Sequence, residues 1–440
     1  MEANIPLLAS QRGFYGYINA LIAFVIFFLL AGSFYALSVL VPFMAAEMGW
    51  SATEFGIAFS IIFLVAGLSS PLVGVIIGRF GPRFSMVIGS FMVSASLFLM
   101  SITTNLWQLY VFTILLGAGV AAGAILPVIQ IVGEWFHNRR SSIMGLVAAG
   151  GGMGGLLFAP LASSLTLMFD SWRTTWLILG GITLIPAVLT ILFVRSKPAD
   201  LGQMPDGIKS SSTIDQQSLP FQQVQRVYKS NTNWKVRQAT KTKAFWLVTL
   251  AKTASIWVMQ SVIAHQVVFL STERDMDLEF SASALGFMAG FSIIGRVIGG
   301  WLGDRVEPRL VMAGLLSFQA TSLLVLTTLS GSLPIYFYVV FMGIGYGGMA
   351  ILPAAAMFNY FGSKKYASIM GVALPVGTLL GAVSPIIAGL IKDLSGTYLP
   401  AFGIMVGVSV FGVICALLAR PPLQPHSPFP AGVGPAKKYG

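Results

Sequence analysis

The stretch Gly117-Ala-Gly-Val-Ala-Ala-Gly-Ala-Ile-Leu-Pro127 returns 226 residues later as Gly343-Ile-Gly-Tyr-Gly-Gly-Met-Ala-Ile-Leu-Pro353. The same offset relates Ser142-Ile-Met-Gly145 to Ser368-Ile-Met-Gly371. Two ungapped matches at one offset indicate that the chain consists of two related halves. Both stretches are apolar and rich in small residues, which let helices approach closely in lipid. Each half is therefore expected to be a bundle of membrane-spanning helices.

The composition supports a membrane protein. Hydrophobic residues make up 56% of the 440 residues and charged residues only 9%, whereas a soluble domain has about 25% charged residues. The net charge of +11 does not indicate a nucleic-acid partner, because the basic residues lie between long apolar runs. The single cysteine, Cys415, excludes an internal disulfide and a cysteine-based metal site.

Apolar runs long enough to cross the roughly 30 Å hydrocarbon layer, about 20 helical residues, recur along the whole chain. They predict twelve transmembrane helices, near 18–44, 54–78, 84–103, 107–133, 141–168, 174–194, 244–271, 281–303, 309–329, 333–360, 367–392 and 400–419. The expected fold is all-α, with an N-terminal six-helix bundle (1–194) and a C-terminal one (244–420) related by pseudo-two-fold symmetry. A polar, basic loop (195–243) links the bundles, and residues 421–440 form a tail.

The basic residues predict the orientation. An even number of spans places both termini and the linker loop on one side of the membrane. The loops and termini on that side hold 21 Lys and Arg, and the loops on the other side hold 3. By the positive-inside rule, both termini and the linker are expected in the cytoplasm. The chain is expected in the plasma membrane, which is the inner membrane if the source is bacterial.

One motif occurs in both halves. Gly74-Val-Ile-Ile-Gly-Arg79-Phe-Gly-Pro-Arg83 and Gly300-Trp-Leu-Gly-Asp304-Arg305-Val-Glu-Pro-Arg309 resemble the loop signature of the major facilitator superfamily. The resemblance implies parallel repeats with a substrate site between the halves near the midplane. It also implies that the glycine permits close helix approach and that the charges latch neighbouring helices. The residues given this gating role are Gly74, Arg79, Arg83, Asp304, Arg305 and Arg309. The first copy has Gly78 where an Asp is usual.

Two further stretches resemble the monocarboxylate transporter family within that superfamily. They are Gly13-Phe-Tyr-Gly16-Tyr17, at the start of the first helix, and Trp135-Phe136-His-Asn-Arg139-Arg140-Ser-Ser-Ile-Met-Gly145 before a Gly/Ala-rich fifth helix. Arg139 and Arg140 are added to the loop-motif residues. The resemblance implies a secondary transporter of small organic anions, above all monocarboxylates of the lactate and pyruvate class. Such a protein works by alternating access, with or without a coupled proton.

Charged groups inside the spans favour an anionic substrate. All 15 Asp and Glu lie in predicted loops or termini or, for Glu54, at the very start of a span, whereas the spans retain Arg296, Lys252 and His265. Arg296 lies about eight residues, roughly 12 Å, from the cytoplasmic end of the eighth span, and its repeat-related position is Ser70. Because guanidinium stays charged and binds carboxylate bidentately, Arg296 is predicted to bind the substrate. The family resemblance implies the same role, although the Asp usual one turn earlier is Ser292 here.

Other polar residues in the spans have two interpretations each. Lys252 either extends to the interface or offers a second cationic site that would permit a dicarboxylate. His265 is either a proton-coupling residue, since histidine titrates near neutrality, or a packing residue. The remaining candidates for contact with the anion are Tyr35, Gln130, Ser292, Tyr346 and Asn359, each of which is also suited to a helix–helix hydrogen bond.

Two other functions stay open. The first is an anion exchanger of the oxalate/formate type, which a second cation in the eleventh span would favour, but 367–391 contains none. The second is a membrane anion sensor or channel, which binding without transport, or currents above carrier rates, would reveal. An enzyme is not expected, because the spans hold no paired carboxylates, no metal-ligand cluster and no phosphate-binding loop. The expected partners are a small carboxylate, a proton and the lipid bilayer, with no cofactor and no obligate protein partner.

Overall fold

The computed structural model describes residues 14–136, 140–207, 228, 230, 234–303, 305–362 and 365–422. The described part contains eleven helices long and apolar enough to cross a membrane, and a bent pair, α2 with α3, supplies the twelfth span. The predicted all-α class with twelve spans is confirmed.

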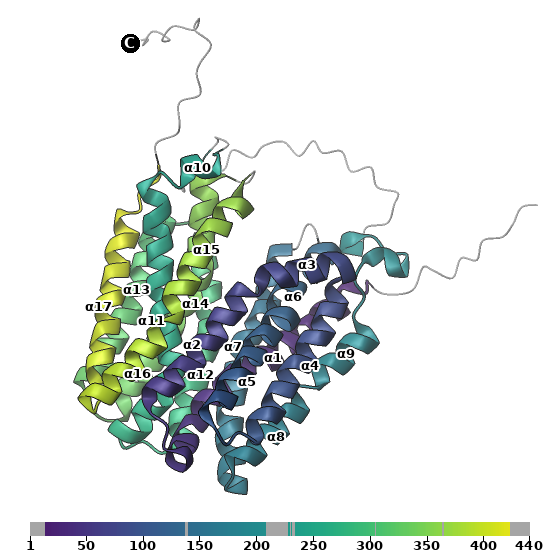
Figure 1. The fold of residues 1–440 in the computed structure, drawn as a ribbon. Coiled ribbons are helices and arrows are strands. Elements are labelled where there is room, and N and C mark those ends of the chain that lie inside the picture. The colour runs from purple at the N-terminus through teal and green to yellow at the C-terminus, as the bar shows by residue number, and fades with distance from the viewer. Residues whose placement is uncertain are drawn as a thin grey trace, which may run out of the picture.

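The first six spans form the N-terminal bundle (Figure 1). Its elements are α1 (Gly16–Met48), α2 (Ala52–Leu68), α3 (Ser70–Phe80), α4 (Pro82–Ser101), α5 (Leu106–Val120), the π-helical η2 (Ala121–Ile125), α6 (Leu126–Trp135), α7 (Arg140–Phe169), α8 (Trp172–Ile182) and α9 (Ile185–Phe193). Two short 3₁₀ turns, Pro198–Leu201 and Pro205–Gly207, follow.

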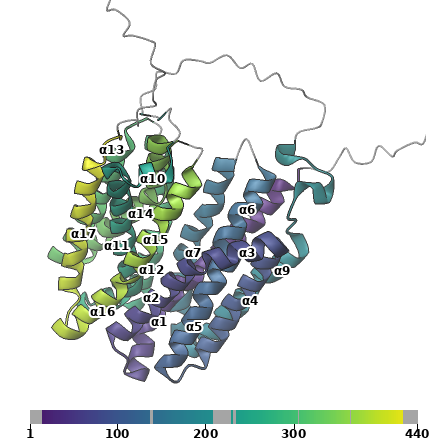
Figure 2. The ribbon, with the colours of Figure 1, turned by 45° about the horizontal axis from the view of Figure 1, so that its top comes forward.

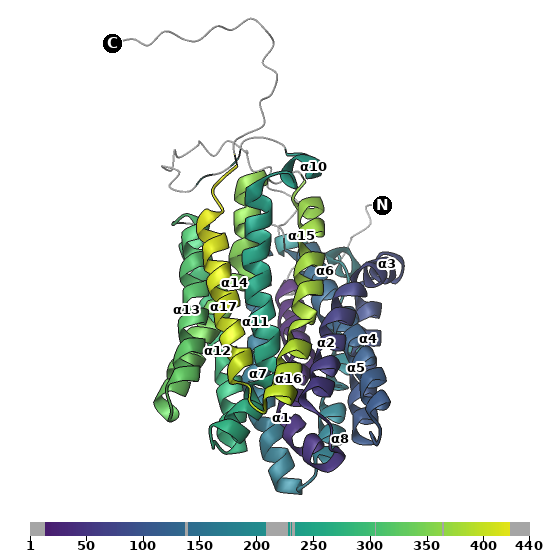
Figure 3. The ribbon, with the colours of Figure 1, turned by 60° about the vertical axis from the view of Figure 1, so that its left-hand side comes forward.

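The C-terminal bundle faces the viewer in Figure 3. Its elements are α10 (Val236–Ala239), α11 (Lys243–Glu273), α12 (Leu278–Gly303), α13 (Pro308–Thr328), α14 (Ser332–Phe361), α15 (Tyr366–Ala382), α16 (Ser384–Ser395) and α17 (Leu399–Leu418). Figure 2 shows the two bundles beside each other.

The two ends of the molecule are named here by their connections. The linker face carries residues 195–207 and 234–242 together with the first and last described residues (Figure 1). The loop face is the opposite end and carries the short connections 49–51, 102–105, 170–171, 274–277, 329–331 and 396–398.

Both described ends of the linker pack against a bundle. The carbonyl of Arg195 accepts hydrogen bonds from Asn19 Nδ2 and Trp135 Nε1, each at 2.9 Å. At the other end, Trp234 is buried and packs edge-to-face on Phe361 with a ring separation of 5.3 Å. These contacts make 195–207 part of the N-terminal bundle and 234–242 part of the C-terminal bundle.

Three spans are broken at a proline. Helix α3 begins with Ser70 and Pro71, α9 with Ile185 and Pro186, and α16 with Ser384 and Pro385. Proline has no N–H and clashes with the preceding turn, so it ends one helix but fits the first turn of the next. The break between α2 and α3 bends that span by 45°.

The internal repeat is visible in matched contacts of the loop-motif arginines. Arg83 donates from Nη2 to the carbonyl of Ile191, in the last turn of α9. At the same offset of 226 residues, Arg309 donates from Nη1 to the carbonyl of Leu417 in the last turn of α17, at 3.0 Å. Carbonyls in the last turn of a helix lack intrahelical partners and attract cations. Each arginine therefore ties the third span of its bundle to the sixth.

Glycines bring the two bundles into contact along α7 and α12. A Cβ added at Gly155 would lie 2.4 Å from Cβ of Ala289, and one at Gly152 would lie 2.8 Å from the Ala289 carbonyl oxygen. Only a residue without Cβ permits this approach, so α7 and α12 pack closely through the glycines of the fifth span.

Candidate functional site

Arg296 extends from α12 to the interface between the bundles. Its Nη1 donates a hydrogen bond to the carbonyl of Ala148 in α7. Its Nε is buried and has no hydrogen-bond partner among the described residues. A buried N–H without a partner costs free energy, so Nε has the capacity for one further hydrogen bond to an acceptor.

A cavity of about 630 Å³ lies beside Arg296. Three helices line it, with Gly145, Leu146 and Ala149 from α7, Ile293, Arg296, Val297 and Gly300 from α12, and Ile351 from α14. Arg296 is the charged member of this lining, and the others are apolar or glycine. The lining residues lie near the linker-face ends of α7 and α12, whereas Gly152 and Gly155 close the same helix pair farther toward the loop face.

Tyr35, Ser292 and Tyr346 lie on helices that pack near Arg296, and none of the three lines this cavity. Tyr35 of α1 is 8% exposed, and its ring packs on α7, since a Cβ at Gly155 would lie 2.8 Å from its Cζ. Tyr35 lies within electrostatic range of both Tyr346 and Arg296. Ser292, one turn before Arg296, is buried and donates to a carbonyl of its own helix at 2.6 Å. The structure thus brings α1, α12 and α14 together around Arg296.

Gln130, Asn359 and Lys252, the other predicted contacts, also lie outside this cavity lining. Gln130 is exposed on α6. Asn359 lies near the linker-face end of α14, where its carbonyl accepts a hydrogen bond from the Ser230 N–H at 2.8 Å. Lys252 is half-buried on α11. Their roles in anion binding stay predictions.

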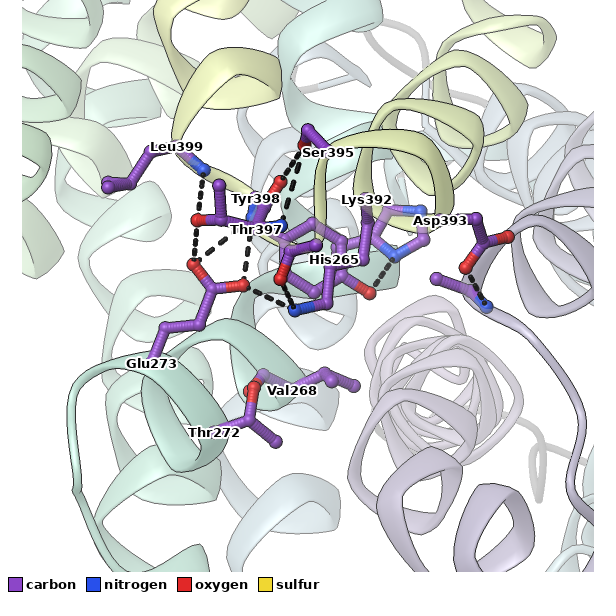
Figure 4. A network of polar contacts seen from close by, with 12 residues as sticks. His265, Val268, Thr272, Glu273, Lys392, Asp393, Ser395, Thr397, Tyr398 and Leu399 are labelled. Atoms are coloured by element: carbon purple, nitrogen blue, oxygen red, sulfur yellow. Dashed lines mark hydrogen bonds and ion pairs between the residues drawn. The ribbon is translucent and has the colours of Figure 1, made fainter.

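His265 lies on α11 near the loop face, buried between α16 and α17 (Figure 4). Its Nε2 is 2.9 Å from the carbonyl oxygen of Pro385, and its Nδ1 is 3.1 Å from the hydroxyl of Tyr398. A carbonyl oxygen only accepts, so Nε2 carries the hydrogen and Nδ1 accepts from the tyrosine hydroxyl. Both nitrogens of the neutral ring are therefore engaged within the protein.

We expect His265→Leu to lower the thermal stability of the protein. The change leaves the buried Tyr398 hydroxyl without its acceptor, at about 1–3 kcal/mol, and removes the second hydrogen bond of the Pro385 carbonyl. Thermal unfolding in detergent measures this loss, and Tyr398→Phe, which removes one of the two bonds, is expected to lose less. An unchanged melting temperature together with uptake that no longer responds to a pH gradient would instead assign His265 to proton coupling.

The remaining loop-motif residues are surface groups on the linker face. Arg79 stacks on Phe80 at 5.3 Å and Arg305 on Trp301 at 4.1 Å, and both arginines are exposed. Asp304 and Arg139 lie outside the described residues, as does the side chain of Arg140 at the start of α7.

Gly74 and Gly300, the first glycines of the two motif copies, make no close helix contact in this structure. A Cβ added at Gly74 or at Gly300 would meet no atom within 4 Å. Gly300 instead lines the cavity beside Arg296. The close approach that the resemblance implies is absent because the two bundles do not touch at these positions.

The two stretches that resemble the monocarboxylate family pack against each other. Phe14 lies 5.8 Å from Trp135 and 5.4 Å from Phe136 between ring centroids, and Tyr17 lies 5.6 Å from Phe136. A Cβ at Gly16 would lie 3.1 Å from the Phe136 ring. These aromatic contacts fix the start of the first span to the end of the fourth on the linker face.

Most of the cavity lining has no chemical signature in the sequence. Glycine, alanine, leucine, isoleucine and valine are also the residues that face lipid, so composition does not distinguish them. The available signal is spacing, since 293, 296, 297 and 300 lie on one helical face of α12, and 145, 146 and 149 on one face of α7.

Two six-helix bundles with a cavity between them define a membrane transporter. Residues 23–385 match the family model described as the Major Facilitator Superfamily. The chain therefore belongs to the major facilitator superfamily, is an integral membrane protein and is a transporter rather than an enzyme.

Curated relatives extend over nearly the whole chain. A hexuronate transporter of Bacillus subtilis is 24% identical over 87% of this chain and 89% of its own length. Monocarboxylate transporter 4 of Gallus gallus is 27% identical over 91% of this chain and 84% of its own length. The relatives thus include transporters named for two kinds of organic acid.

A solved structure supports the fold. A bacterial homologue of the human lysosomal transporter Spinster, in an inward-facing and occupied conformation, superimposes with a TM-score of 0.69 at 15% identity. The match covers 93% of this chain and 97% of that one.

Proposed function

We propose that this chain transports small monocarboxylates and that Arg296 binds the substrate carboxylate. The observation that carries the proposal is the buried, unpartnered Nε of Arg296 beside a cavity. With Nη1 bonded to the Ala148 carbonyl, the guanidinium edge formed by Nε and Nη2 remains. A carboxylate matches this edge with two parallel hydrogen bonds.

The protein places no carboxylate beside Arg296 among the described residues. The acidic residues within described helices all lie in a terminal turn, namely Glu47, Glu54, Glu134, Glu273, Glu279 and Asp393. A charge in the membrane is costly unless it is paired. A substrate carboxylate would supply the missing negative charge, which favours an anion over a cation or a neutral solute.

The apolar lining of the cavity favours a short acid with an apolar body. Apart from Arg296, the lining is aliphatic or glycine, and the hydroxyls of a sugar acid would lose their hydrogen bonds against it. Lactate and pyruvate carry one carboxylate and a small body, so they fit this lining better than a hexuronate does. The relatives named monocarboxylate transporters agree with this preference.

We further propose that the linker face is cytoplasmic and that the protein is in the plasma membrane. Of the Lys and Arg outside the predicted spans, 21 lie on the side of the linker and termini and 3 on the opposite side, which is the asymmetry of cytoplasmic loops. In this orientation the Arg296 cavity lies toward the cytoplasm. We propose a proton, carried with the substrate, as the coupled ion.

Uptake of labelled lactate into proteoliposomes, with and without an inward pH gradient, tests the proposal. We expect saturable uptake that pyruvate inhibits and that lactamide, of the same size but without a carboxylate, does not. Glucuronate is expected to compete poorly. If the protein takes up glucuronate but no lactate, its substrates are sugar acids and not monocarboxylates. Uptake that requires preloaded oxalate or formate would identify an exchanger, and lactate binding without uptake a sensor.

A further inference from the structure

Helix α16, the loop-face half of the eleventh span, is held at both ends by its own bundle (Figure 4). At its start, the Pro385 carbonyl accepts from His265 Nε2 at 2.9 Å. Near its end, Lys392 Nζ donates to Glu273 Oε1 of α11 at 2.8 Å, and the same oxygen accepts from the backbone N–H of Tyr398 at 2.8 Å. These bonds fix the direction in which α16 presents its other side chains.

One of those side chains reaches the opposite bundle. Asp393 Oδ1 accepts from the backbone N–H of Ala52 at 3.0 Å. Its Oδ2 accepts from the backbone N–H of Thr53 at 2.8 Å and from the Thr53 hydroxyl at 2.5 Å. The helices are close here, because a Cβ added at Gly389 would lie 2.4 Å from the Ala52 carbonyl oxygen. A carboxylate of the C-terminal bundle thus caps the first turn of α2 in the N-terminal bundle.

The chemistry of a helix start explains the strength of this contact. The first N–H groups of a helix lack intrahelical acceptors, and the start of the helix carries a partial positive charge. In α2, the Ser51 hydroxyl accepts from the Glu54 N–H at 3.3 Å. The two preceding N–H groups, of Ala52 and Thr53, depend on Asp393. When α2 and α16 separate, these bonds must be exchanged for water.

We propose that Asp393 is a latch residue that holds the loop face closed and favours the conformation in which the Arg296 cavity opens toward the linker face. Two sets of side-chain hydrogen bonds join the bundles in the described part of the chain, those of Asp393 near the loop face and that of Arg296 nearer the linker face. Opening of the loop face requires the Asp393 bonds to break. The Glu273–Lys392 pair positions the latch by holding α16.

Cysteine labelling in detergent tests the latch without any substrate, so its outcome is independent of the lactate assignment. Cys415→Ala removes the single native thiol. Gly145→Cys then reports on the linker-face cavity. Ser60→Cys reports on the interface toward the loop face, because Ser60 is 5% exposed and lies one turn beyond Gly56, which abuts the Pro385 carbonyl.

Asp393→Ala is expected to raise the labelling rate at Ser60→Cys and to lower it at Gly145→Cys. Loss of a helix cap and its charge corresponds to a roughly 3- to 30-fold change in the ratio of the two conformations. Asp393→Asn, which keeps one acceptor oxygen, and Thr53→Val, which removes only the hydroxyl, are expected to give smaller shifts in the same direction. These two milder variants keep the test valid if Asp393→Ala folds poorly.

A matched control and a double variant complete the test. Glu47→Gln breaks the ion pair with Arg173 near the same face but within one bundle, so the labelling ratio should stay unchanged. Lys392→Met should shift the ratio of the two labelling rates in the parent protein. It should cause no further shift in the Asp393→Ala background, because Lys392 acts through Asp393. Unchanged labelling in all three latch variants, or an equal shift in Glu47→Gln, would overturn the proposal.

Discussion

Arg296→Ala is expected to reduce the transport efficiency for lactate by roughly 30- to 3,000-fold in proteoliposomes. Removing one partner of a buried, hydrogen-bonded charge pair costs about 2–5 kcal/mol, and every 1.4 kcal/mol is a factor of ten. The loss is expected in both the half-saturating concentration and the maximal rate, because the aliphatic lining offers no other partner for the carboxylate.

Two further variants distinguish the loss of a carboxylate ligand from the loss of a positive charge. Arg296→Lys keeps the positive charge but loses the planar fork, so we expect partial activity with a raised half-saturating concentration. Arg237→Ala removes an exposed arginine of α10 on the linker face and is expected to transport normally. Undiminished uptake by a well-folded Arg296→Ala variant would eliminate the carboxylate-ligand mechanism.

Gly347→Ala is expected to lower the melting temperature and to abolish transport. A Cβ at this position would lie 1.9 Å from the carbonyl oxygen of Ser292 and 2.8 Å from its Cα. Both contacts are with backbone, so α12 and α14 must move apart, which costs about 1–3 kcal/mol or more. The displaced segment is one turn from Arg296, so the binding site is altered as well.

Gly371→Ala is the matched control for this change. A Cβ at Gly371, within α15, would meet no atom within 4 Å, and alanine is favoured over glycine in a helix by up to about 1 kcal/mol. We expect normal uptake and an equal or slightly higher melting temperature. If Gly347→Ala has the melting temperature and the uptake rate of the parent protein, the close contact between α12 and α14 is not required for the binding site.

The fold was largely predictable from the sequence. In lipid the backbone must satisfy its own hydrogen bonds, so each long apolar run becomes a helix whatever its neighbours are. Twelve spans and a parallel repeat follow from this local rule. The breaks before Pro71, Pro186 and Pro385 were not predicted, because proline also occurs inside continuous helices of this chain, as at Pro160 and Pro375.

The candidate site was predictable only in part. Arg296 is recognisable from sequence because a charge in the middle of an apolar run is costly and therefore marks a function. His265 allowed two interpretations, and only the tertiary contacts reveal that both its nitrogens are bonded. Asp393 follows directly after the predicted eleventh span, where a carboxylate is an ordinary loop residue. Its role in capping α2 becomes apparent only from the tertiary structure, which places the start of α2 beside it.

The sequence by itself determined the class of protein and the number of spans, and it predicts an anionic substrate, since these depend on the cost of placing each segment or side chain in lipid. Only the tertiary structure decided which side chains meet. Asp393 and Thr53 are 340 positions apart, and their contact depends on the tilt and rotation of helices packed through small residues such as Gly389 and Gly56. Those angles arise from the packing of all the helices together, and no single span encodes them.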